Sequence, residues 1–227
     1  SLRFMQSGGG LTSADRFRGH NAILSGPAAG LVACARLAGR NGIARVIGFD
    51  MCGTSTDVCA AEAAVAAEAA VAAETSSAAG VVDGGRGSGE FDKVYEWKVA
   101  GLRVRSPTLD IHTVAAGGGS LCRLQAGRLG VGPESAGSDP GPLCYGLVDG
   151  AGRPKASDLA VTDINFFLGR LLQDNFPLPL RTEGVAGALA GMRDRLRAEG
   201  VEMSAEDLGL GFLEVVNRRM AQAVKDI

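Results

Sequence analysis

The clearest pattern along the chain is a pair of apolar runs joined by a short turn, residues 46–58. Val46, Ile47 and Phe49 lead to Asp50, a Gly/Thr/Ser turn follows, and Asp57 opens a second apolar run. This alternation predicts strand, tight turn and strand over residues 45–61. Small residues let backbone N–H groups and hydroxyls approach an anion, and a glycine-rich turn can bind phosphate without a lysine. An ordinary hairpin with a glycine turn explains the stretch equally well.

The two carboxylates that flank the turn add chemistry. Asp50 and Asp57 would repel bare phosphate, so a metal ion or an activated water has to lie between them and a phosphate group. This combination favours a Mg-nucleotide site.

Helical spacing is found before the turn and in the last third of the chain. Residues 25–37 predict a helix capped by Ser25 and stopped by Gly39. Residues 160–169 predict the start of a helix, which Thr162 or Asp163 would cap and Gly169 would end. Val185, Leu189, Met192 and Leu196 predict a further amphipathic helix, and Ser204 caps the last one, with Leu208, Phe212, Val215, Val216 and Met220 as its buried stripe.

Strand-like alternation returns in the middle of the chain. Residues 94–99 and 102–105 predict short strands, and 120–125 with 128–131 predict a hairpin that turns at Ala126-Gly127. Residues 132–142 predict a stiff loop, because they hold three prolines. Residues 61–90 are Ala/Gly-rich with little bulk, and we expect a low-complexity surface insertion there.

Further polar residues are candidates for a site. Three consecutive glycines, 117–119, indicate the close approach of a ligand or of another backbone. Asp110 and His112 precede them, and His112 could be a base, a ligand or a hydrogen-bonded structural histidine. Glu134 and Asp139 lie in the proline-rich loop, which suits a site better than a linker.

Composition excludes some classes of protein. The net charge is −2 and no basic stripe occurs, which argues against binding to nucleic acid or to an anionic membrane. No apolar run reaches the roughly 18 residues that span a bilayer. The five cysteines are odd in number and lack a C-x-x-C pair, so reduced thiols in a cytoplasmic protein are expected. The chain begins without Met and closes inside a helical pattern, as an internal piece of a longer protein would.

Several motifs occur together in one order. They are Ser25-Gly26-Pro27, Gly48-Phe49-Asp50-Met51, and residues 53–58, 109–111, 113–114, 117–120, 131–135, 139–142, 144–145 and 161–163. In this order they resemble the hydantoinase/oxoprolinase family over residues 4–60 and 91–227. Within the family the chain looks most similar to the eukaryotic type that opens the lactam of 5-oxo-L-proline with ATP, a reaction of the glutathione cycle.

The resemblance implies an α/β fold: an actin-like ATPase lobe of the sugar-kinase, Hsp70 and ribonuclease H-like type, with a mixed sheet and flanking helices. Residues 1–227 would be an internal part of one hydantoinase A-type ATPase domain, its second lobe. ATP and Mg²⁺ are the implied cofactors. The implied partners are 5-oxoproline or a related cyclic amide, the remaining lobe, a hydantoinase B-like half and a second copy in a homodimer.

The resemblance also suggests residue roles. Asp50 and Asp57 would be catalytic or hold the metal through water. Gly53, Thr54, Ser55 and Thr56 would contact phosphate, with Gly117, Gly118 and Gly119 at the same cleft. Asp110, His112, Glu134 and Asp139 would be weaker substrate contacts.

Alternatives stay open at this point. A hydantoin-opening enzyme or an acetone-carboxylase-type subunit would share the ATP half and differ in substrate. A non-catalytic assembly lobe is a further possibility, because Cys52 and Ala29 replace glycines of the family pattern. A cysteine at position 52 would be strained if the turn required a positive φ there.

Overall fold

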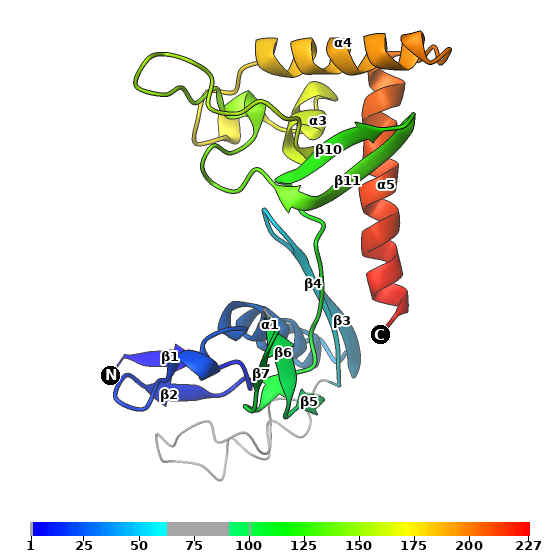
Figure 1. Cartoon of the computed structure of the whole chain (residues 1–227). Coiled ribbons are helices and arrows are strands. Elements are labelled where there is room, and N and C mark those ends of the chain that lie inside the picture. The colour runs from blue at the N-terminus through cyan, green and yellow to red at the C-terminus, as the bar shows by residue number, and fades with distance from the viewer. Residues whose placement is uncertain (1, 63–90, 100) are drawn as a thin grey trace. The chain divides into compact units, whose positions relative to one another are not determined.

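The computed structural model describes residues 2–62, 91–99 and 101–227. It divides into two compact units. Unit 1 comprises Ser1–Asp50, Asp57–His112 and Ile227, and unit 2 comprises Met51–Thr56 and Thr113–Asp226. Figure 1 labels the elements of both. Most of the predicted insertion, residues 63–90, lies outside the described residues, and its first two residues, Ala61 and Glu62, belong to a strand.

Unit 1 is built from helices and several short strands. The helices are η1 (Gly19–Asn21) and α1 (Ser25–Arg40), and the strands that lie wholly or partly in this unit are β1 (Arg3–Met5), β2 (Leu11–Ser13), β3 (Arg45–Met51), β4 (Thr56–Glu62), β5 (Lys93–Val94), β6 (Trp97–Val99), β7 (Leu102–Val104), β8 (Thr108–Leu109) and β9 (His112–Val114). β3, β4 and β9 form a three-stranded sheet in that order. The pairs β1–β2, β5–β8 and β6–β7 are antiparallel.

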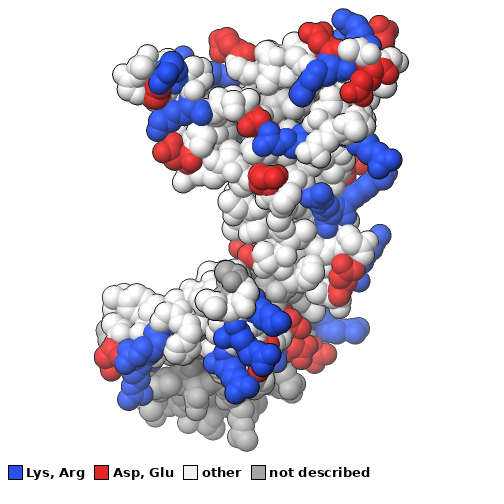
Figure 2. Space-filling view, viewed as in Figure 1, with Lys and Arg blue, Asp and Glu red and all other residues white. Residues whose placement is uncertain are grey.

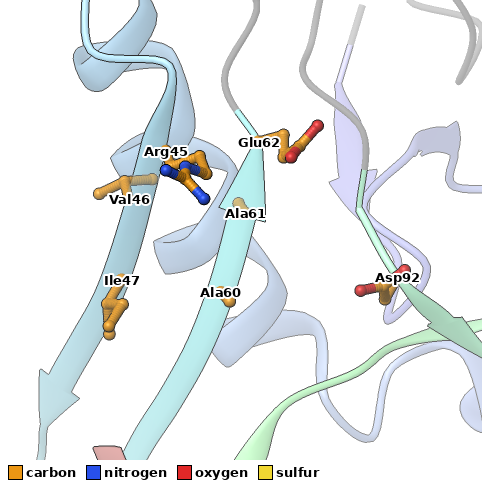
Figure 3. A pocket seen from close by; sticks show the side chains of 7 residues that line it. All are labelled: Arg45, Val46, Ile47, Ala60, Ala61, Glu62 and Asp92. Carbon is orange, nitrogen blue, oxygen red and sulfur yellow. The ribbon is translucent and has the colours of Figure 1, made fainter. Parts of the chain in front are cut away.

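The predicted strand–turn–strand is confirmed by β3 and β4, which run in opposite directions (Figure 3). The helix before them differs at both ends from its prediction. Leu24 rather than Ser25 is the N-cap residue, because its carbonyl already accepts the N–H of Ala28 at 3.0 Å. Gly39 does not stop the helix, which continues to Arg40. Ala28, Leu31, Val32 and Ala35 of α1 pack against Cys59 and Ala61 of β4 and against Leu109 in the core of this unit.

Unit 2 contains most of the helices that the structure describes. They are η2 (Leu143–Tyr145), α3 (Val161–Phe167), η3 (Gln173–Asn175), α4 (Glu183–Ala198) and α5 (Ala205–Lys225). The strands β10 (Ser120–Gln125) and β11 (Arg128–Ser135) form the predicted antiparallel hairpin, with Ala126 and Gly127 at positive φ in its turn. β11 continues through residues 132–135, which the prolines had indicated as loop. Here the register shifts between Ser120 and Cys122, so the strand accommodates an irregularity instead of ending.

The core of unit 2 lies between the hairpin and the three α-helices (Figure 1). The predicted stripe of α4, Val185, Leu189, Met192 and Leu196, is buried. On α5, Leu208, Phe212 and Val216 are buried as predicted, while Val215 and Met220 are only partly buried and Leu213 takes their place. Ser204 caps α5 by accepting the N–H of Asp207 at 2.9 Å. Among the described residues, no helix has both the length and the apolar character that crossing a bilayer requires.

Charged side chains of both signs lie interspersed on the face shown in Figure 2. In unit 1, Glu96 pairs with Arg103 and Arg105, each at 3.1 Å. All three side chains are well exposed, and exposed pairs of this kind contribute about 0–1 kcal/mol. These charges therefore have little influence on which fold the chain adopts.

Candidate phosphate turn and carboxylate pocket

Asp50 and Asp57 line one cavity of unit 1, with a volume of about 180 Å³. Side chains alternate along a strand, so Gly48 and Asp50 share one face of β3, and Asp57 and Cys59 share one face of β4. Pro27, Gly30 and Cys34 of α1 close the cavity on the other side. The chain thus brings both predicted acids to one pocket beneath one helix.

Gly30 lets the helix come close to Asp50. A Cβ at position 30 would lie 3.4 Å from Asp50 Oδ2, which is tighter than an ordinary contact. The two acids differ in exposure: Asp57 is 8% exposed, whereas Asp50 is open to solvent. One carboxylate is therefore part of the pocket wall and the other reaches its mouth.

The carboxylate pocket fits the way proteins hold Mg²⁺ beside a nucleotide. Mg²⁺ is usually bound through one or two carboxylates, and phosphate oxygens and waters supply its other ligands. In the described part of the chain, no group of three or more His, Cys, Asp or Glu side chains could hold a metal by itself. Two carboxylates that line one cavity therefore suit a metal ion whose other ligands are phosphate oxygens and waters.

The turn between the acids, Met51–Thr56, belongs to unit 2. The N–H of Cys52 donates to the carbonyl of Ser55 at 2.8 Å and closes the turn. The carbonyls of Cys52 and Gly53 accept the N–H groups of Gly118 and Gly119, at 3.1 and 2.6 Å. In a trans peptide the C=O and the following N–H point in opposite directions. The N–H groups of Gly53 and Thr54 consequently point away from the glycine loop, and both residues are exposed.

The three glycines are required by this backbone contact. A Cβ on Gly117 would lie 2.6 Å from the carbonyl oxygen of Cys52, and one on Gly119 would lie 2.9 Å from that of Gly53. The N–H of Gly117 donates to Ser120 Oγ at 2.9 Å, so all three glycine N–H groups have partners in the fold. What approaches the glycines is thus the turn itself. Direct contact between these glycines and a cofactor stays a prediction.

Thr56 lies in the interior rather than on the exposed side of the turn. Its side chain is fully buried, and its hydroxyl donates to the carbonyl of Ala116 at 2.6 Å and contacts Met220 Sδ at 3.4 Å. In this structure Thr56 anchors the turn. The exposed turn residues Gly53 and Thr54 and the half-buried Ser55 are better placed than Thr56 to meet a phosphate.

The weaker candidates divide between the two units. Asp110 and His112 belong to unit 1, and Ile111 between them lines the carboxylate pocket whereas they do not. Glu134 is exposed on β11, and Asp139 pairs with Lys155 at 3.0 Å, both in unit 2. Their predicted role as substrate contacts stays a prediction.

The segment Val161-Thr162-Asp163 has a structural role that its sequence did not reveal. Asp163 is fully buried and accepts three backbone N–H groups, from Ala160 at 2.8 Å, Cys144 at 2.7 Å and Leu143 at 3.1 Å. The N-cap of α3 is Ala160, so Asp163 caps the helix from its third position. Thr162 donates through its hydroxyl to the carbonyl of Gly118 at 2.9 Å. The start of α3 therefore positions both the glycine loop and η2, and no local pattern could reveal partners so distant in sequence.

A larger cavity of unit 1, of about 650 Å³, lies elsewhere on the same strands (Figure 3). Figure 3 shows Arg45 where β3 begins and Glu62 where β4 ends, with Ala60 and Ala61 just before Glu62 on β4. Asp50 and Asp57 do not line it. The charged residues Arg45, Glu62 and Asp92 line it beside four apolar ones, but neither of the two predicted acids does, so the smaller pocket is the better candidate site.

Comparison with known proteins identifies the family of the chain. The family model described as hydantoinase/oxoprolinase matches residues 1–227. The protein called 5-oxoprolinase 1 from Arabidopsis thaliana is 37% identical over all of this chain, which spans 16% of that protein. The ATP-dependent caprolactamase from Pseudomonas jessenii superposes with a TM-score of 0.69 at 28% identity, covering 100% of this chain and 28% of the other.

A nucleotide-free acetone carboxylase superposes with a TM-score of 0.74 at 23% identity, covering 99% of this chain and 27% of the other. That likeness is one of fold. The chain thus spans only a small part of the relatives it matches. The whole-length match and the order of its motifs show that the chain belongs to the hydantoinase/oxoprolinase family, with the mixed α/β, actin-like ATPase fold of that family.

Proposed function

We propose that this chain supplies part of the ATP-phosphate site of an ATP-dependent cyclic amide hydrolase, one that converts 5-oxo-L-proline to L-glutamate. The observation that carries the proposal is the turn after Asp50. Its carbonyls are tied back to Gly118 and Gly119, so the N–H groups of Gly53 and Thr54 face the opposite way. A pair of oriented backbone donors between two carboxylates suits the terminal phosphates of a metal-bound nucleotide.

The chemistry explains why a lactam hydrolase would need such a site. An amide is a poor electrophile because nitrogen donates its lone pair into the carbonyl. Transfer of a phosphoryl group from ATP to the lactam oxygen gives an imidate-like species that water can attack. Inorganic phosphate then leaves and the ring C–N bond breaks, which gives a carboxylate and an amine. Catalysis of this kind depends on positioning and on stabilising the transferred charge.

The residues divide into those that would face the nucleotide and those that hold them. Gly53, Thr54 and Ser55 would donate to phosphate, and Asp50 and Asp57 would hold the waters of Mg²⁺, which neutralises phosphate charge. Thr56 and the loop Gly117–Gly119 hold the turn in place. The role of these residues toward the nucleotide stays a prediction.

The alternative of a non-catalytic lobe loses part of its support. Its main reason was the strain that a positive φ would impose on Cys52. Among the described residues other than glycine, only Ala126 has a positive φ. Cys52 therefore adopts the turn without that strain. An enzyme that opens hydantoin, or another lactam such as the one in the name of the P. jessenii relative, would share the ATP-phosphate site and differ in the part that binds the substrate.

The deciding experiment is turnover of the full-length protein with 5-oxoproline, hydantoin and caprolactam, each with and without ATP. We expect phosphate and glutamate release only with 5-oxoproline and ATP together. ATP-dependent turnover of hydantoin or caprolactam without turnover of 5-oxoproline would show that the proposed substrate is wrong, while the proposed class of reaction would stand. Absence of ATP hydrolysis with all three would favour the assembly lobe.

Several features of the whole protein belong to the same proposal. They are the other lobe of the ATPase domain, a hydantoinase B-like half, a homodimer, a cytoplasmic location and a place in the glutathione cycle. The length of the relatives agrees with further parts, since this chain spans 16% of the Arabidopsis protein.

A further inference from the structure

Two cysteine sulfurs lie on either side of one glycine in unit 1. Gly48 of β3 is buried, and a Cβ on it would lie 2.8 Å from Cys59 Sγ and 3.8 Å from Cys34 Sγ. The two sulfurs are therefore no farther apart than the sum of these distances. A side chain larger than hydrogen at position 48 would collide with Cys59, so this glycine leaves room for the pair.

Both thiols line the carboxylate pocket together with Asp50 and Asp57. Cys34 comes from α1 and Cys59 from β4, so the pair connects the helix to the sheet that it covers. Any covalent bond between the sulfurs would change the wall of the pocket that holds the acids.

The two thiols differ in access. Cys34 is partly exposed, whereas Cys59 is 5% exposed. A small oxidant reaches Cys34 first, and Cys59 is the second thiol close by. Thiol oxidation sensors use such a pair, one residue oxidised and the other resolving it.

We propose that Cys34 and Cys59 form a modification site for hydroperoxides that closes to a disulfide across Gly48. The hydroperoxide transfers one oxygen to Cys34, which becomes a sulfenic acid, and the hydroperoxide is reduced to an alcohol or to water. The Cys59 sulfur then attacks the Cys34 sulfur, the S–O bond breaks, and the hydroxyl leaves as water with the Cys59 proton. Two thiols are oxidised and one hydroperoxide is reduced.

The bond draws α1 toward β4, because bonded sulfurs are about 2.05 Å apart. Gly30 and Asp50 lie on the same helix–sheet contact, so the pocket changes shape. We expect the disulfide to lower ATP-dependent turnover, an effect that rests on the function proposed above.

The disulfide is tested by mass spectrometry. The full-length protein is treated with hydrogen peroxide, alkylated and digested without reduction. We expect a peptide pair joined through Cys34 and Cys59, which dithiothreitol separates and which is absent from Cys34→Ser and Cys59→Ser. Cys52→Ser is the matched control, since Cys52 is an exposed cysteine and its loss should leave the pair intact. A sulfinic acid at Cys34 without the bond, or a bond from Cys34 to another cysteine, overturns the proposal.

The effect on the pocket has a separate readout. ATP-dependent turnover of each variant is compared before and after peroxide and again after dithiothreitol, relative to its own reduced rate. We expect the wild type to lose most of its turnover reversibly and Cys59→Ser to resist that reversible loss. A mapped disulfide with unchanged turnover overturns the link to the pocket. Reduced protein without turnover contradicts the proposed function, while the peptide map still decides whether the disulfide forms.

Discussion

Asp50 and Asp57 line the same cavity in different surroundings. Asp57 is almost wholly buried in β4, and Asp50 is open to solvent near the end of β3. Burying a charge is costly unless an opposite charge or hydrogen bonds compensate it. We infer that Asp57 shapes the pocket and that Asp50, at its mouth, is the acid more readily changed without harm to the fold.

The first prediction concerns Asp50→Asn. This change keeps the shape of the side chain and removes its charge, so metal and phosphate would be held poorly. We expect turnover of 5-oxoproline with ATP to fall at least roughly a hundredfold, the scale on which one well-aimed electrostatic group acts. The apparent midpoint of thermal unfolding should stay near that of the wild type.

Asp194→Asn provides the control, because Asp194 is exposed on α4 and only pairs with Arg197 at 3.8 Å. It should retain full turnover. Unchanged turnover in Asp50→Asn would remove this residue from the mechanism.

At the scale of elements, the turn and the glycine loop are one construction. Residues 51–56 and 117–119 meet backbone to backbone, and Thr56 and Thr162 add side-chain bonds from either side. The loop's glycines are explained by the space that the turn occupies. Local patterns predicted β3, β4, the β10–β11 hairpin and the last two helices, because each depends on neighbouring residues. They could not predict which segment approaches the glycines, since that partner lies some sixty residues away.

The second prediction concerns Gly117→Ala. The new Cβ would overlap the carbonyl oxygen of Cys52, and backbone cannot retreat as a flexible side chain can. We expect a loss of about 1–3 kcal/mol in stability, typical of overpacking, and a raised KM for ATP with a smaller change in KM for 5-oxoproline. Thermal unfolding and steady-state kinetics of the full-length protein measure both.

Gly187→Ala is the matched control. Position 187 lies inside α4 with open space around it, so alanine should leave kinetics unchanged and stabilise the helix by about 0.5–1 kcal/mol. Equal KM values for ATP in Gly117→Ala and the wild type would show that the turn does not need this close contact.

At the scale of the whole molecule, the chain spans only a small part of the longer proteins of its family. Its motifs predicted the family and the fold, which the comparisons confirm. They gave no sign of two compact units, because three of the boundaries between the units fall inside single strands, β3, β4 and β9. Unit division follows from long-range packing, and the order of apolar residues along a strand does not record it.

The third prediction is that the isolated 227-residue chain has no 5-oxoproline-dependent ATPase activity. It carries the candidate phosphate turn and two acids, whereas its relatives are several times longer. Phosphate release by the isolated chain should equal that of a blank, while the full-length protein releases phosphate under the same conditions. Robust release by the chain alone would show that the site is complete within it.

The contact between Cys52-Gly53 and the loop Gly117–Gly119 also limits how such enzymes can diverge or be recombined. Gly117 and Gly119 cannot gain a side chain unless the turn withdraws, whereas a Cβ on Gly53 would meet nothing within 4 Å, so larger residues in the glycine loop are expected only together with a changed turn. A chimera that transplants the nucleotide turn from one relative without its facing glycines should assemble badly, whereas exchanging both segments as a set preserves the fit.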